Sequence, residues 1–123
     1  MVVPFTTDEL ELIAATKEVF IETRSGERVY RTVIWVAVDD EHVYVRSVSG
    51  ESGRWYQRAL ADPEVTLDLG DTRLLARAIP VTDDESVELA SEGFNRKYPR
   101  GRSLDAMIRP EVLDSTLRLD AMS

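Results

Sequence analysis

The chain has 123 residues, of which 43% are hydrophobic and 31% are charged, and its formal net charge is −8. These values are typical of a soluble globular protein with one modest core, so we predict a single domain over residues 1–123. The negative charge disfavours general nucleic-acid binding, and no apolar run approaches the roughly 18 residues that a membrane helix requires. The chain contains no cysteine, which excludes disulfides and thiol chemistry and fits a bacterial-type cytoplasmic setting.

The first predicted element is a short helix that begins after Thr6. Thr6 and Glu9 have the spacing of a capping box, and Phe5 and Leu10 have that of a hydrophobic staple. We expect this helix to end near Lys17, where a strand-like pattern begins.

Three strands are predicted next, at residues 18–24, 28–38 and 42–49, with tight turns at Ser25-Gly26 and Asp40-Glu41. The second turn gives one almost wholly aliphatic face, made by the pairs Val38–Val43, Val36–Val45 and Ile34–Ser47. On the opposite face the same register pairs Trp35 with Arg46 and Ala37 with Tyr44.

A further hairpin is predicted from strands at residues 64–69 and 72–81, with its turn at Gly70-Asp71. Its inward pairs are Leu67–Leu74 and Val65–Ala76. Its outward pairs, Asp68–Arg73 and Glu64–Arg77, join opposite charges, which stabilises an antiparallel register.

The last third of the chain begins with Thr82-Asp83-Asp84-Glu85, which has capping-box spacing and predicts a helix to about Tyr98. Residues 99–110 are predicted to be irregular, with a helical turn after Ser103, and residues 115–122 to form the sixth strand. The fold class is therefore mainly β with short helices, arranged as a small closed or split six-stranded antiparallel barrel.

The loop that precedes the helix at residues 55–61 is the main candidate site. It combines glycine, serine and arginine, in the residues Ser47, Ser49, Gly50, Ser52, Gly53 and Arg54. Free backbone N–H groups at a helix start, together with hydroxyl and guanidinium groups, suit a bound phosphate. The alternative interpretation is an ordinary solvent loop in which Ser52 caps the helix and Arg54 is exposed.

This order of elements resembles the flavin-binding split-barrel superfamily, the pyridoxamine-phosphate-oxidase-like proteins. The resemblance is carried by residues 43–47, the Gly/Ser loop, Trp55-Tyr56 and residues 59–67. Deazaflavin-dependent nitroreductase-like members have a similar strand, loop, Trp-Tyr helix and following strand. Residues 97–119 are similar to a small uncharacterised bacterial branch.

The resemblance implies a homodimeric split barrel that binds FMN or a deazaflavin at the subunit interface, with the cofactor phosphate near the loop. The matching positions are Arg46, Ser47, Ser49, Gly50, Ser52, Gly53 and Arg54. Two features depart from the nitroreductase-like pattern: Arg58 stands where that motif usually has asparagine, and a longer N-terminal region with a Lys-Ser-Gly-type loop is missing. Some branches of the superfamily bind haem derivatives or no cofactor, so the fold alone does not fix the chemistry.

Trp35 and Arg46 are expected to face outward together, as a shelf for a cofactor ring or as a cation–π pair. The alternative is that Trp35 is buried beneath a helix or a partner subunit. We expect a homodimer through this outward face, which carries Val33, Trp35, Ala37, Tyr44 and Val48.

Other patterns favour structural interpretations. His42 is the only histidine and lies in an acidic turn, where solvation is the usual state, so no metal site is predicted. The basic segment 96–102 could touch an anionic cofactor tail, but cations are also common at a helix C-terminus. We place Arg102 outside the site and use it as the control position.

No nucleophile motif is present, and no side chain is identified as catalytic. The predicted function is a flavin- or deazaflavin-dependent oxidoreductase of unknown substrate, in which the cofactor performs the chemistry. The alternative is a cofactor-free module that binds a small ligand or a protein and retains the barrel.

Overall fold

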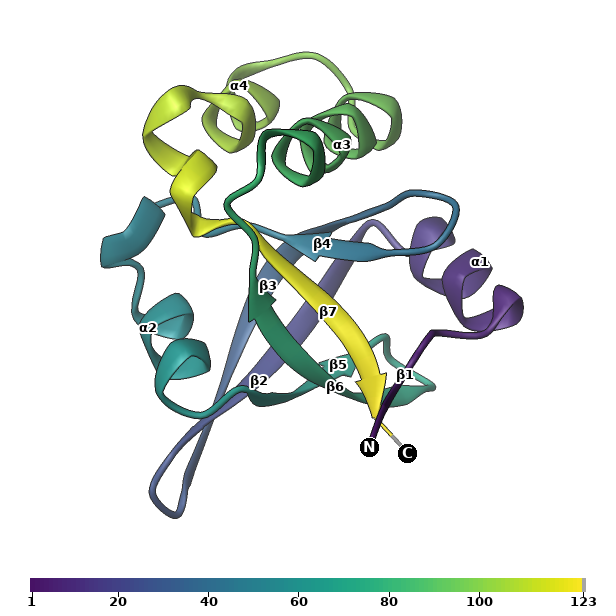
Figure 1. The fold of residues 1–123 in the computed structure, drawn as a ribbon, viewed down its shortest axis with the longest axis vertical. Coiled ribbons are helices and arrows are strands. Elements are labelled where there is room, and N and C mark those ends of the chain that lie inside the picture. The colour runs from purple at the N-terminus through teal and green to yellow at the C-terminus, as the bar shows by residue number, and fades with distance from the viewer. Residues whose placement is uncertain (123) are drawn as a thin grey trace.

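Antiparallel strands pair in the order β1-β7-β4-β3-β2-β5-β6, and a further pairing of β6 with β7 closes the barrel (Figure 1). The structure, a computed structural model, describes residues 1–122. The strands are β1 (Val2–Val3), β2 (Glu18–Ser25), β3 (Arg28–Val38), β4 (Val43–Val45), β5 (Glu64–Asp68), β6 (Arg73–Pro80) and β7 (Leu117–Met122). The predicted six-stranded antiparallel barrel is confirmed, and β1 is an additional short strand paired with the end of β7.

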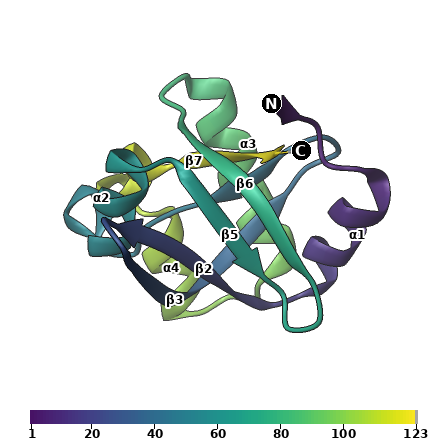
Figure 2. The same cartoon turned by 90° about the horizontal axis from the view of Figure 1, so that it is seen from below.

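The helices are α1 (Thr7–Ala15), α2 (Arg54–Ala61), α3 (Asp84–Lys97) and α4 (Arg102–Ile108), with 3₁₀ turns η1 (Gly50–Ser52) and η2 (Pro110–Ser115). Figure 1 shows α3 and α4 together at one end of the barrel, with α1 and α2 on opposite sides of it. In the view from below, β5 and β6 cross the front of the molecule with no helix over them (Figure 2). None of the helices in residues 1–122 is long and apolar enough to cross a membrane.

The predicted registers are largely confirmed. All four predicted pairs between β5 and β6 are present, and β3 pairs with β4 through Val36–Val45, Ala37–Tyr44 and Val38–Val43. The predicted pairs Ile34–Ser47 and Trp35–Arg46 are wrong, because β4 ends at Val45. Beyond it, Ser47 turns away from β3, donating its N–H to the Ser115 hydroxyl at 3.1 Å and accepting from Gly50 N at 2.9 Å.

The aliphatic face predicted for the β3–β4 hairpin lies inside the barrel. Ile34, Val36, Val43 and Val45 are buried, and they share one core cluster with residues of β2, β5 and β7. Alternation with period 2 therefore placed these side chains correctly.

The opposite face of the hairpin is covered within the chain. Ala37 and Tyr44 are buried in a second cluster with Phe94 of α3 and Met107 of α4. The predicted dimer face is therefore wrong for Ala37 and Tyr44, because α3 and α4 cover the surface that a partner was expected to cover.

Two helix starts illustrate the strength of capping signals. The capping box at the start of α1 is confirmed, with Glu9 N donating to Thr6 Oγ1 at 3.1 Å and Thr6 N to Glu9 Oε1 at 2.8 Å. Helix α3 begins one residue later than predicted, because Asp83 is the N-cap and accepts from Ser86 N at 2.9 Å. Both Thr82 and Asp83 are good caps, and spacing alone did not discriminate between them.

The segment predicted to be irregular contains a helix. Helix α4 spans Arg102–Ile108, where only one turn was expected. Leu104 and Met107, three residues apart, pack into the second cluster against α3. That contact stabilises a helix too short to be stable alone.

The C-terminal end of α3 is tied to the barrel by two polar side chains. The Tyr98 hydroxyl accepts from Val36 N at 3.1 Å and donates to the Lys17 carbonyl. Lys97 Nζ donates to the carbonyls of Ile13 and Val36, each at 3.0 Å. At least Lys97, in the basic segment 96–102, therefore has a structural role, joining α3 to α1 and β3.

We expect Tyr98→Phe to lower the free energy of unfolding by about 1–3 kcal/mol, because the buried Val36 N–H loses its acceptor. The matched control is Tyr30→Phe, since the Tyr30 hydroxyl has no partner among residues 1–122. Urea denaturation of both variants measures the difference. Equal effects from the two substitutions would show that the Tyr98 hydroxyl does not anchor α3.

Candidate functional site

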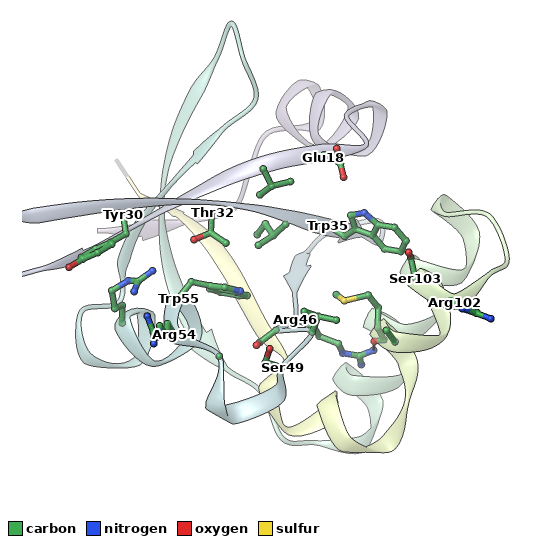
Figure 3. A pocket seen from close by; sticks show the side chains of 18 residues that line it. Glu18, Tyr30, Thr32, Trp35, Arg46, Ser49, Arg54, Trp55, Arg102 and Ser103 are labelled. Atoms are coloured by element: carbon green, nitrogen blue, oxygen red, sulfur yellow. Dashed lines mark hydrogen bonds between the residues drawn. The ribbon is translucent and has the colours of Figure 1, made fainter.

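A groove of about 850 Å³ opens between β3, the loop after β4, and helices α2 and α4 (Figure 3). Its lining residues are Glu18, Tyr30, Thr32, Val33, Ile34, Trp35, Arg46, Ser47, Val48, Ser49, Gly53, Arg54, Trp55, Arg58, Arg102, Ser103, Ala106 and Met107. Four of them are arginines and only Glu18 is a carboxylate. A groove of this size with excess positive charge favours an anionic small molecule.

The structure brings together most of the candidate site residues. Trp35, Arg46, Ser47, Ser49, Gly53 and Arg54 line the groove. Gly50 and Ser52 do not line it. The Ser52 hydroxyl donates to the Ser49 carbonyl at 2.8 Å, and the N-cap of α2 is Gly53, so Ser52 does not cap the helix.

The wall formed by α4 was missed by sequence reasoning. Arg102, placed outside the site and chosen as the control position, lines the groove together with Ser103 and Met107. Its place was missed because residues 99–110 were expected to be irregular. The spacing of Leu104 and Met107 was the available signal.

The two loop glycines are required by close packing. Gly50 has a φ of +65°, and a Cβ there would lie 3.0 Å from the Glu111 carbonyl oxygen of η2. A Cβ on Gly53 would lie 2.0 Å from Ser47 Oγ. The loop therefore folds tightly onto η2 and onto its own first residue, which positions the start of α2 beside the groove.

Ser47 is a buried residue whose hydroxyl oxygen is itself accessible in this region. The residue is 1% exposed, and its Oγ has no hydrogen-bond partner in the part of the chain that the structure describes. Helix α2 begins next to it, and no side chain accepts from the N–H groups of its first turn. The Ser47 hydroxyl and the first backbone N–H groups of α2 are therefore unpaired donors at one end of the groove, where phosphate oxygens could accept from them.

Arg46 has a different place from the one predicted. It is 1% exposed and donates to Thr116 Oγ1, Ser91 Oγ, and the carbonyls of Met107 and Val87, at 2.7–3.1 Å. Its guanidinium lies 5.6 Å from the Phe94 ring centroid and has no described carboxylate partner. Burial lowers the pKa of Arg46 to about 10, so it stays charged at neutral pH. Arg46 thus ties α3 and α4 to Thr116, the residue before β7, and adds positive potential to the groove.

Trp35 forms a rigid aromatic surface at the other end of the groove. Its indole stacks on the Tyr98 ring, with centroids 3.8 Å apart and planes 1° apart. In Figure 3, Trp35 lies beside Ser103, whereas Arg54 and Tyr30 lie at the opposite end. We call the end with Arg54 the cationic end and the end with Trp35 the aromatic end, although Tyr30 also lies at the first and Arg102 at the second.

The carboxylate of Asp39 is hydrogen-bonded within the acidic turn around His42. Asp39 Oδ1 accepts from the N–H groups of Glu41 and His42 at 2.8 and 2.6 Å, and it lies 3.7 Å from His42 Nδ1. Within residues 1–122, no group of three or more histidine or carboxylate side chains is placed to hold a metal. The turn is thus explained by its own hydrogen bonds.

We expect Gly53→Ala to destabilise the protein by about 1–3 kcal/mol, because the new methyl group overlaps the Ser47 hydroxyl. In the double variant Ser47→Ala/Gly53→Ala, part of this loss is expected to be recovered, since the atom at 2.0 Å is gone. A double-mutant cycle by urea denaturation measures the coupling. Strict additivity of the two substitutions would contradict this packing.

Comparison with known proteins identifies the family and the fold. Residues 9–119 match the sequence profile of the family described as uncharacterized protein conserved in bacteria, DUF2255. No curated protein matches the chain in sequence.

Solved structures share the barrel at low sequence identity. HutZ, the heme storage protein from Vibrio cholerae, has a TM-score of 0.71 and 14% identity, over 94% of this chain and 89% of that one. An FAD-binding protein from Mesorhizobium loti has a TM-score of 0.69 and 14% identity, over 100% and 93%. A putative pyridoxamine 5'-phosphate oxidase from Listeria innocua has a TM-score of 0.64 and 12% identity, over 94% and 90%. The chain therefore belongs to the bacterial DUF2255 family and has the fold of the flavin-binding split-barrel superfamily.

Proposed function

We propose that the groove binds FMN or a deazaflavin and that the protein is an oxidoreductase whose chemistry is performed by this cofactor. The observation that carries the proposal is the polarity of the groove, with Arg54 at one end and Trp35 at the other. A flavin-type cofactor has the same polarity, because it joins a phosphate to a planar ring. The FAD-binding relative of the same fold supports this choice.

The cationic end suits the phosphate. Arg54 is exposed and makes no ion pair or hydrogen bond within residues 1–122, so its guanidinium is available. Ser47 Oγ and the first N–H groups of α2 lie beside it and also lack internal partners. We assign Ser47, Ser49, Gly53 and Arg54 to the phosphate, since a dianion needs several donors and at least one cation.

The aromatic end suits the ring. Tyr98 holds Trp35 in one orientation, and the groove surface nearby includes Val33 and Val48, which are 50% and 53% exposed. A planar ring over these side chains would remove apolar surface from water. A bound flavin or deazaflavin supplies hydride-transfer chemistry, while the protein orients the ring and excludes water.

A cofactor-free binding module is the second candidate. The glycines of the loop are explained by contacts with Glu111 and Ser47, and Arg46 donates to four internal acceptors. A barrel that binds no cofactor would need these same features. Titration with cofactors therefore discriminates between the two candidates.

We propose a homodimer that covers the open side of the groove, because Val33 and Val48 leave apolar surface exposed there. Light scattering at several concentrations is expected to give twice the mass of one chain, 13.9 kDa. Val33→Asp is expected to shift the protein toward the monomer. A monomer at every concentration would overturn the proposal.

We expect Arg54→Ala to weaken FMN or deazaflavin binding by about tenfold or more, because a charge-assisted hydrogen bond to the phosphate is lost. The control is Arg77→Ala, because Arg77 is exposed on β6 and does not line the groove, unlike Arg102. Fluorescence titration measures both variants against the parent. If the parent binds neither cofactor at high micromolar concentration, the redox proposal fails and the binding-module proposal replaces it.

A further inference from the structure

A second hollow, of about 480 Å³, adjoins the groove. It lies between the β2–β3 turn and the residues Arg54, Gln57 and Arg58 of α2. Tyr30, Arg54 and Arg58 line both spaces, so the groove and this basic hollow share one border. We propose that the basic hollow holds a second phosphate of the ligand, so that the site takes a cofactor with a pyrophosphate group in preference to a mononucleotide. This inference rests on the proposed function and changes its preferred flavin from FMN to one that carries a pyrophosphate group.

The two arginines at the border, Arg54 and Arg58, are neighbours on one helix and have no counter-ion among the described residues. Arg54 and Arg58 are four residues apart on α2, where like charges repel each other. Neither has a carboxylate within 4.0 Å in residues 1–122. By contrast, Arg24 at the rim pairs with Glu64 at 3.1 Å and with Asp62 at 3.7 Å. In a chain of net charge −8, two adjacent unpaired arginines mark a place where an external anion would supply the missing charge.

Arg58 is held in position for such an anion. Its Nε donates to the hydroxyl of buried Thr23 at 2.9 Å, and its guanidinium lies 4.1 Å from the Tyr30 ring centroid. These two contacts fix the plane of the guanidinium. The terminal nitrogens Nη1 and Nη2 have no partner among the described residues, which leaves the fork that binds phosphate oxygens in pairs.

Two other polar side chains of the hollow, Asp62 and Gln57, are engaged elsewhere and do not pair with Arg54 or Arg58. Asp62 is the only carboxylate that lines it and is paired with Arg24. Gln57 Nε2 donates to the Glu51 carbonyl at 3.2 Å. Arg54 at the shared border therefore suits the first phosphate, and Arg58 suits the second.

Calorimetric titration with FMN, FAD, AMP and ADP tests the proposal. We expect the parent to bind FAD and ADP about tenfold or more tightly than FMN and AMP, respectively. Arg58→Gln is expected to reduce both ratios to about threefold or less, because it weakens FAD and ADP more than FMN and AMP. The control Arg77→Gln keeps the parent's ratios. Arg58→Lys retains the charge without the fork and should give intermediate ratios; it decides the question if Arg58→Gln does not fold.

The adenine nucleotides separate this proposal from the proposed function. If the flavins bind and FAD has no advantage over FMN, the basic hollow is not a phosphate site, while the proposed function stands. Equal weakening of all four ligands by Arg58→Gln would also overturn it. If ADP is preferred over AMP and neither FMN nor FAD binds, the hollow is supported, and the deazaflavin titration described above decides the proposed function. If none of the four ligands binds, the hollow proposal fails, and the same deazaflavin titration decides the proposed function.

Discussion

The buried guanidinium of Arg46 is the constraint on which the site depends. It sits where β4 leaves the sheet, and it donates four hydrogen bonds to groups on α3, on α4 and on Thr116, the residue before β7. All four acceptors are neutral, so the cation is solvated by dipoles inside the protein rather than by a counter-ion. Removing it would take one hydrogen bond from each of four acceptors at once. The end of β4 and the packing of α3 and α4 therefore depend on the same side chain.

The shape of the groove also follows from the contacts of Arg46. Because the chain departs from β3 at Arg46, the next residues turn outward, and Gly50 and Gly53 fold them back against η2 and Ser47. Because Arg46 also holds the Met107 carbonyl, α4 stands opposite this loop and forms the second wall. The same side chain thus sets the position of both walls, and its positive charge remains between them.

Sequence reasoning located the strands well because the information is local. The β5–β6 hairpin was predicted residue by residue, since its inward aliphatic pairs and outward opposite charges agree on a single register. The end of β4 was not predicted, because Val45-Arg46-Ser47-Val48 still alternates as a strand would. What ends it is a set of acceptors more than 40 residues away in the chain. Helix α4 was missed for a related reason, since seven residues form a stable helix only through tertiary contacts.

The site, like the fold, was predicted where its signal is local in the sequence. Ser47, Ser49 and Arg54 were found because a Gly/Ser loop before a helix has a recognisable pattern, whereas the wall carrying Arg102 depends on tertiary packing.

The acidic and basic side chains are distributed unevenly over the surface. On the sheet of β2, β3, β5 and β6, Glu22 and Asp68 pair with Arg31 and Arg73 at 2.6–3.3 Å, and Arg73 holds the pKa of Glu22 below its usual range. These pairs neutralise that surface, whereas the arginines of the groove remain unpaired with carboxylates. Fields are screened over roughly 8–10 Å at physiological salt, so a small anion in the groove experiences its local positive charge. A long polyanion would also meet the acidic remainder of the surface, and this difference favours a cofactor-sized ligand over nucleic acid.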